Sequence, residues 1–171
     1  TNSGRVVNQL SVDGRPCPPM KAHTVISAAP LEAFLCLMSN GRVLRPDAEH
    51  RASFEVVESI DEHADIIHMV FRPLFLFPMW TQSRDFVLFR YWRLEPDGSY
   101  VICFESMDHR KCPTTSKHVR GDMHAVFTIS PLEKSLRRKA LKQNLPSECL
   151  MSATVQVDPK GYVPTSRWSF L

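Results

Sequence analysis

The sequence is poor in glycine, and its glycines form no nucleotide-binding motif. Six glycines are dispersed along 171 residues, and neither G-x-x-x-x-G-K nor G-x-G-x-x-G occurs among them. Long apolar runs are also lacking, because the segments 31–38 and 74–80 are far shorter than the roughly 20 residues that cross a bilayer as a helix. These absences exclude a P-loop or dinucleotide site and predict a soluble domain.

Cysteine usage indicates a reducing compartment. The five cysteines are odd in number and lie far apart in the sequence: Cys17, Cys36, Cys103, Cys112 and Cys149. This distribution argues against a disulfide framework and favours a cytoplasmic location. The sequence carries neither an initiator Met nor a signal-peptide pattern at Thr1, so we interpret it as a fragment or an excised domain.

A zinc-like spacing occurs but does not fit a compact metal site. Cys103, His109, Cys112 and His118 follow the pattern C-x5-H-x2-C-x5-H. Cys103 falls within a predicted strand, however, and a proline follows Cys112, so the pattern lacks the tight knuckle of zinc sites. No Gly-x-Ser-x-Gly elbow or similar motif frames a nucleophile. We therefore predict no metal, no cofactor and no catalytic residue.

Basic residues are concentrated in one short segment. Residues 134–142 contain five cations and no acid, so the rest of the chain carries 3 − 5 = −2 of the formal charge of +3. This local basicity disfavours a nucleic-acid-binding face. Two interpretations of the segment stay open, a solvated loop or a short amphipathic stretch on an anionic membrane surface. The membrane contacts would then be Arg137, Arg138, Lys139 and Lys142.

The order of predicted elements indicates an α+β domain. Residues 1–19 show little periodicity and are interpreted as a linker or a poorly ordered lead-in, before a first strand over residues 20–27. A helix should follow, because Pro30 suits a first helical position and Glu32 falls in the first turn. Its apolar residues recur at helical spacing: Leu31, Phe34, Leu35 and Met38.

Alternating sequences predict six further strands, at residues 54–59, 65–72, 85–93, 100–107, 122–130 and 150–158. Hairpins or polar loops join them, so we expect an antiparallel sheet. The connection over residues 72–82 is rich in large apolar side chains. It is either buried against the sheet or exposed to lipid.

Arg90 is out of place on the central predicted hairpin. It shares one strand face with Phe86, Leu88 and Trp92, so its guanidinium must reach water, be paired, or meet something polar inside a cavity. If Asp97-Gly98 is a two-residue loop, Arg90 stands opposite Glu105. If Pro96-Asp97-Gly98 closes a bulged turn, Arg90 stands opposite Phe104. A cross-strand pair of Arg90 with Glu105 on a solvated face is one interpretation.

This hairpin also carries a family resemblance. The segments FPM at 77–79, SRDFVLFR at 83–90, YWR at 91–93 and the turn DGSY at 97–100 resemble START (steroidogenic-acute-regulatory-related lipid transfer) domains. They resemble above all the START module of the plant enhanced-disease-resistance-2 proteins. Val119-Arg120 and the segment DPKGYVP at 158–164 extend the likeness. The Trp-Asp pair usual before the second hairpin is absent, since residues 44–50 read LRPDAEH.

The resemblance implies a helix-grip fold, in which a curved antiparallel sheet with an N-proximal helix wraps around a long C-terminal helix. That last helix would follow Pro164 and is mostly missing from a chain that stops at Leu171. The START-like domain would then occupy residues 20–171. The resemblance also implies a lipid-sized cavity between sheet and helix.

The function implied is lipid binding by enclosure, for lipid transfer or lipid sensing. Arg90 is the predicted head-group contact, because START domains commonly place a charged residue at this point. In the sterol-binding branch this Arg pairs with an acid on an adjacent strand, and the matching place here is expected near Met69. That mismatch favours a phospholipid or similar polar lipid over a sterol. The other predicted ligand contacts are Met69, Phe86, Leu88, Trp92, Phe104, Glu105 and His124.

Two alternatives come from other function classes. Relatives with the grip architecture include hydrolases and cyclases, and an enzyme here would need Arg90 to converge with Glu105 or His124. A regulatory module with a vestigial cavity is the other alternative. The resemblance further implies a monomer peripheral to membranes, with neighbouring domains such as a pleckstrin-homology domain, and no nucleic-acid partner.

Overall fold

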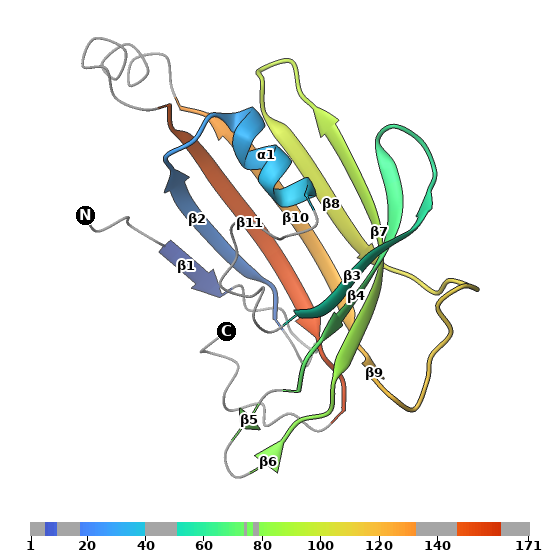
Figure 1. The fold of residues 1–171 in the computed structure, drawn as a ribbon. Helices are drawn as coiled ribbons and strands as arrows, with labels where there is room; N and C mark the ends of the chain where they lie inside the picture. Colours follow the sequence, from blue (N-terminus) through green and yellow to red (C-terminus); the bar gives the residue numbers. More distant parts are fainter. Residues whose placement is uncertain are drawn as a thin grey trace.

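The computed structural model describes residues 6–9, 18–39, 51–73, 75–76, 79–132 and 147–161. Within these residues a single sheet of nine strands dominates the fold (Figure 1). Its strand order is β1-β2-β11-β10-β8-β7-β4-β3, and the short β9 pairs with β7. A separate two-stranded sheet joins β5 to β6.

The strands have the following bounds: β1 (Val6–Gln9), β2 (Met20–Ile26), β3 (Arg51–Ser59), β4 (Ala64–Phe71), β5 (Phe75–Leu76), β6 (Met79–Trp80), β7 (Arg84–Leu94), β8 (Tyr100–Ser106), β9 (Val119–Arg120), β10 (Asp122–Pro131) and β11 (Cys149–Asp158). All pairings in the nine-stranded sheet are antiparallel except that of β7 with β9.

One helix, α1 (Pro30–Met38), connects β2 to the rest of the sheet. Its start is fixed by Pro30 in the first helical turn and by Glu32, whose Oε2 accepts a hydrogen bond from the Ala29 N–H at 2.9 Å. Phe34 is buried between two aromatic side chains of the sheet, with ring centroids 4.8 Å from Trp92 and 4.4 Å from Tyr100. Phe34 therefore lies at the centre of the contact between the helix and the sheet, with Ala33, Leu37 and Met38 packed in the same cluster.

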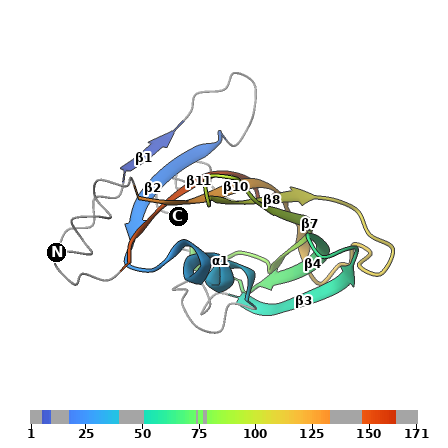
Figure 2. The same ribbon diagram turned by 90° about the horizontal axis from the view of Figure 1, so that it is seen from above.

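The sheet is strongly curved. In Figure 2 it arches over α1, and β3 and β4 curl round to the side on which α1 lies. We call the side that packs against α1 the inner face and the opposite side the outer face. The buried apolar residues on the inner side form two clusters: Ala33 and Phe34 of α1 with Ile102, Ile129 and Cys149 of the sheet in the first, and Ile67, Phe86 and Leu88 in the second. Phe104 packs against both clusters and joins them.

The predicted first strand, the helix and the six later strands are confirmed, with shifts of a few residues at their ends. Four residues of the segment predicted as a lead-in form a strand instead. Val6–Gln9 pair with Met20–His23 at the edge of the sheet. The predicted basic segment and the C-terminal helix fall in residues 133–146 and 162–171, outside the described residues. No helix in the described ranges is long and apolar enough to cross a bilayer.

The turn between β7 and β8 determines which residue of β8 lies opposite Arg90. Leu94 lies opposite Tyr100, the Glu95 N–H donates to the Ser99 carbonyl at 2.8 Å, and Gly98 adopts a φ of 84°. This is the longer, bulged turn, which permits a positive φ at glycine. Arg90 therefore lies opposite Phe104, and the alternative pairing with Glu105 is wrong.

Candidate functional site

Arg90 is buried on the inner face, where it forms an ion pair with Asp65 of β4. The two residues are directly opposite in the β4–β7 register. Nε of Arg90 donates to Oδ1 of Asp65 at 2.9 Å, and a terminal nitrogen donates to Oδ2 at 2.5 Å. Arg90 is 4% exposed. This two-point contact is the strongest geometry available to a guanidinium and a carboxylate.

A third hydrogen bond ties the pair to the helix. The other terminal nitrogen of Arg90 donates to the Met38 carbonyl at 3.2 Å, where α1 ends. The last carbonyls of a helix have no partner within the helix and carry the negative end of its dipole, so a cation is favourable there. Arg90 thus joins β4, β7 and α1 at one point.

The surroundings of the pair are apolar. Phe104 lies opposite Arg90 on β8, and the Phe54 ring centroid is 5.8 Å from the guanidinium carbon. Leu88 and Trp92 flank Arg90 on the same strand face. A buried ion pair in such a place costs desolvation that its mutual attraction barely offsets, so it adds little stability compared with apolar residues. Its presence needs another explanation.

The guanidinium keeps hydrogen-bonding capacity. An arginine has five N–H donors, and the three bonds to Asp65 and Met38 leave two of them without a partner among the described residues. Asp65 neutralises the charge of Arg90, so an uncharged oxygen, such as a hydroxyl or a carbonyl, is the acceptor best matched to the site.

Five of the predicted ligand contacts share the inner face with Arg90. Phe86, Leu88 and Trp92 precede and follow it on β7, Met69 lies opposite Phe86, and Phe104 lies opposite Arg90 itself. Phe86 and Leu88 are buried, whereas the other three are half-buried. The expected place of the acid was wrong, because the carboxylate beside Arg90 is that of Asp65, four residues before Met69.

The structure does not bring Glu105 and His124 together with Arg90. These two residues pair across β8 and β10 on the outer face, with Nδ1 of His124 2.9 Å from Oε1 of Glu105. Both side chains are about half exposed. The convergence of Arg90 with Glu105 or His124, which an enzyme would need, is not formed.

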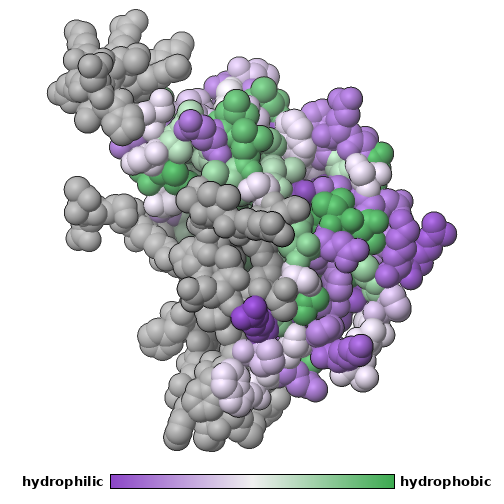
Figure 3. Space-filling view, viewed as in Figure 1, coloured by the Kyte–Doolittle hydropathy of each residue, from purple (hydrophilic) through white to green (hydrophobic). Residues whose placement is uncertain are grey.

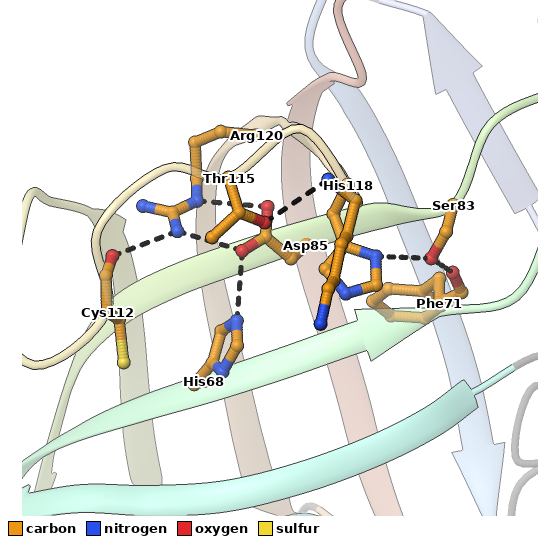
Figure 4. A network of polar contacts seen from close by, with 9 residues as sticks. His68, Phe71, Ser83, Asp85, Cys112, Thr115, His118 and Arg120 are labelled. Carbon is orange, nitrogen blue, oxygen red and sulfur yellow. Dashed lines mark hydrogen bonds and ion pairs between the residues drawn. The ribbon is translucent and has the colours of Figure 1, made fainter.

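A second polar cluster, on the outer face, was missed by sequence reasoning. Asp85 of β7 accepts hydrogen bonds from Nε and a terminal nitrogen of Arg120, at 3.1 and 2.8 Å, and contacts Nε2 of His68 at 3.0 Å (Figure 4). Arg120 also donates to the Cys112 carbonyl at 3.0 Å. The cluster thereby fastens the connection between β8 and β9 to β7 and β4.

Asp85 is 5% exposed, and burial acts to raise the pKa of its carboxyl. The hydrogen bonds from Arg120 and His68 outweigh that effect and hold the pKa below its ordinary value. The bond to Asp85 in turn raises the pKa of Arg120. The cluster is therefore an ion pair at neutral pH with every partner inside the protein, and it is better suited to holding the fold than to chemistry.

The neighbouring residues Ser83 and Arg84 have similar structural roles. Oγ of Ser83 donates to the Phe71 carbonyl at 2.6 Å and lies 2.9 Å from Nδ1 of His118. Arg84 is buried and donates to the carbonyls of Gln82, Pro159 and Lys160. Parts of the segments that carry the family resemblance, residues 83–85, 119–120 and 158–161, thus fasten the end of β7 to its surroundings.

Within the described ranges, no group of three or more His, Cys, Asp or Glu side chains is placed to hold a metal ion. Lys111 and His109 of the β8–β9 connection instead contact Glu58 of β3, at 3.1 and 3.4 Å. Burial raises the pKa of the Cys112 thiol, and nearby Glu55 adds to this effect. A thiol with a raised pKa is a poor nucleophile.

Comparison with known proteins agrees with this geometry. A family model described as "START domain" matches residues 5–169. A curated protein of Arabidopsis thaliana named "Protein ENHANCED DISEASE RESISTANCE 2-like" is 33% identical over 148 residues. The match covers 84% of this chain but 19% of that protein, so the chain spans a small part of its relative's length.

Solved structures share the fold. Human StAR-related lipid transfer protein 5 superposes with a TM-score of 0.77 at 20% identity, covering 96% of this chain and 73% of that one. Human STARD10 superposes with a TM-score of 0.74 at 19% identity, covering 96% of this chain and 61% of that one. At these identities the likeness establishes the architecture, a curved sheet with a helix on its inner face.

Proposed function

The chain belongs to the START domain family, and from that premise we propose that it binds a single lipid against the inner face of its sheet. Membership supports the class of ligand. The apolar character of the inner face supports the place, because burying a lipid tail there would contribute about 25 cal/mol per Å² of apolar surface removed from water.

The observation that carries the proposal is the ion pair of buried Arg90 with half-buried Asp65. The pair adds little to stability, yet it interrupts an apolar face that would otherwise be continuous. A lipid with its tail on the inner face needs one polar contact to fix its orientation. Arg90 has two N–H groups to donate, and the site's net charge is near zero.

This neutral pair bears on the class of lipid. The preference for a phospholipid over a sterol was based on a missing acid beside Arg90, and Asp65 removes that basis. We propose that the lipid oxygen that accepts a hydrogen bond from Arg90 is uncharged. A phospholipid meets this condition through an ester carbonyl, with its phosphate outside the apolar face, and a sterol meets it through its hydroxyl.

The oligomeric state, the location and the partners of the chain are also proposals. We expect a monomer in the cytoplasm, peripheral to membranes and without a nucleic-acid partner, that either transfers its lipid or senses it. The relative named above is much longer than this chain, so a neighbouring pleckstrin-homology domain remains part of the proposal. No specific observation favours the enzyme or the vestigial module over lipid binding, since Glu105 and His124 lie on the outer face.

The test is native mass spectrometry of lipids retained by the purified chain. Truncating Arg90 alone would leave the half-buried carboxylate of Asp65 without its partner, so the informative variant replaces both, as Arg90→Met with Asp65→Leu. The matched control, Glu105→Gln with His124→Gln, removes an exposed pair on the outer face. We expect one lipid class in wild type and control, and its loss in the inner-face variant.

Two different results would contradict the role of Arg90 and the proposed function separately. A folded inner-face variant that retained the same lipid in the same amount would contradict the role of Arg90. A folded wild type that retained no lipid and took up none from sterol or phospholipid vesicles would contradict the proposed function. Identification of the retained lipid decides between phospholipid and sterol.

A further inference from the structure

The connection between β8 and β9 projects from the side of the sheet, at the right of Figure 1. At one end of its outermost part, the Cys112 carbonyl accepts a hydrogen bond from Arg120 at 3.0 Å (Figure 4). At the other end, the Val119 N–H donates to the Ser83 carbonyl at 2.9 Å. We call residues 113–117 the tip, and all five are exposed. The fold therefore presents the tip to solvent on a fixed base.

The tip carries hydroxyl groups in a basic setting. Its sequence is PTTSK, in which Thr114, Thr115 and Ser116 are consecutive. Residues 109–121 contain no acid and four Lys or Arg residues: Arg110, Lys111, Lys117 and Arg120. Figure 3 shows hydrophilic side chains gathered over this part of the surface. The tip contains no large apolar side chain, so it lacks the group that a bilayer would bury. Hydroxyls among cations fit instead a protein kinase that selects basic substrates.

The spacing of the cations singles out one hydroxyl. Kinases of this class hold a cation about three residues before the acceptor hydroxyl, through acidic groups of their own. Only two Ser or Thr residues in the sequence have Lys or Arg three positions before them. Thr114 follows Lys111 at this spacing, and Thr24 follows Lys21. Arg110 supplies a second cation before Thr114.

The structure separates these two threonines. Thr24 lies within β2, where it pairs with Met151 of β11, and it is half-buried. Its backbone is already committed to the sheet, so a kinase cannot hold it as an extended peptide. Thr114 is exposed and lies between strands, and Pro113 favours an extended chain at Cys112. The fold therefore hides the pattern at Thr24 and presents it at Thr114.

We propose that Thr114 is a phosphorylation site for a protein kinase that selects basic substrates. The γ-phosphoryl group of ATP passes to Oγ1 of Thr114, so its bond to the β–γ bridging oxygen breaks and a new P–O bond forms. ADP leaves, and the hydroxyl proton passes to the catalytic Asp of the kinase. The modification goes beyond lipid binding and does not depend on it.

The phosphate would change the charge of the connection. It adds about two negative charges at neutral pH to a segment that holds four cations and no acid. It also offers a second anion to Lys111, whose Nζ lies 3.1 Å from Oε2 of Glu58 on β3. Phosphorylation of Thr114 would thus act on the contact between the connection and the edge strand of the sheet.

The first test is phosphorylation of the folded 171-residue chain. Two kinases that select basic substrates and need no lipid are used separately: the catalytic subunit of cAMP-dependent protein kinase and the catalytic fragment of protein kinase C. Peptide mapping by mass spectrometry locates the phosphoryl group. We expect it on Thr114 with at least one kinase, none on Thr24, and its loss in Thr114→Ala. The matched control, Ser116→Ala, removes a neighbouring exposed hydroxyl and should be modified on Thr114 as wild type is.

The second test asks whether the kinase recognises Lys111. Lys111→Gln should lower kcat/KM for Thr114 about tenfold, because one charge-assisted contact with the kinase is lost. The exposed contact of Lys111 with Glu58 adds little stability, so this variant should fold. The matched control is Lys21→Gln, which removes the cation at the same spacing before Thr24. It should leave the rate at Thr114 unchanged.

Three results would overturn the proposal: no phosphoryl group on Thr114 of folded wild type with either kinase, a phosphoryl group on Thr115 or Ser116 in its place, or an unchanged rate in Lys111→Gln. Sedimentation with phosphatidylserine vesicles is measured in parallel. If wild type stayed unmodified but bound these vesicles, and Lys111→Gln bound them less, the cations would serve an anionic membrane surface instead.

Discussion

Gly121 and Phe86 approach each other so closely that no side chain fits between them. A Cβ placed on Gly121 would lie 2.5 Å from Cε1 of the Phe86 ring and 3.1 Å from the Asp158 carbonyl oxygen. Phe86 is buried, and its ring lies edge-on to that of Phe71, with the two ring centroids 5.7 Å apart. The Gly121 N–H donates to the Asp85 carbonyl at 2.9 Å. The glycine therefore lets the chain between β9 and β10 pass directly over the second core cluster.

We expect Gly121→Ala to lower the free energy of unfolding by about 1–3 kcal/mol, the usual cost of forcing an extra carbon into a packed core. The measurement is urea denaturation, in which the midpoint should fall while the slope stays the same. Combining Gly121→Ala with Phe86→Leu should cost less than the two single changes added together. Strict additivity would show that the ring is not what excludes the methyl group.

Arg90→Lys tests whether the planar arrangement of N–H donors in the guanidinium is needed for stability and for lipid retention. An ammonium keeps the charge beside Asp65 but cannot make the two-point contact and the bond to Met38 together. We expect a loss of about 1–3 kcal/mol in the free energy of unfolding and weaker retention of lipid. Thermal unfolding and native mass spectrometry measure the two effects. Equal lipid retention by Arg90→Lys would show that charge alone suffices.

Local patterns in the sequence were enough to predict the elements. The alternation over residues 85–93 and the turn residues Glu95–Ser99 specify a hairpin, and Pro30 and Glu32 specify a helix start. The sequence did not decide the register of that hairpin, because Gly98 permits either turn. The structure chose the bulged turn, and this one-residue difference determines whether Phe104 or Glu105 faces Arg90.

The partner of Arg90 could not be predicted because the β4–β7 register is not local. Asp65 and Arg90 are 25 residues apart in sequence, and the β5–β6 hairpin intervenes. No turn chemistry fixes the alignment of strands joined by such a connection. The same applies to Asp85 and Arg120, which are 35 residues apart. For Arg90, a charge on a predicted apolar face signalled a missing partner without identifying it, whereas sequence reasoning did not single out Asp85.

The exposed pair on the outer face should matter little. Glu105 and His124 are 61% and 49% exposed, so their interaction is screened by water. We expect Glu105→Gln to change the free energy of unfolding by less than about 0.5 kcal/mol at neutral pH. Chemical denaturation of the variant measures this. A larger loss would indicate that the outer face is covered by another part of the protein.

Asp85 should make the stability of the chain fall in acid. Because its pKa is lowered in the folded state, its contribution is fully present above the ordinary value of 3.8 and is lost as the pH falls through the lowered folded value. At neutral pH, Asp85→Asn leaves the half-buried Arg120 without its counter-charge, which should cost about 3 kcal/mol. In strong acid the wild-type carboxyl is protonated too, so wild type and variant should converge. Denaturation of both proteins between neutral pH and about pH 2 measures that difference, with Glu105→Gln as the control. A difference that stayed constant across the range would mean that Asp85 acts through its shape and hydrogen bonds and not through its charge.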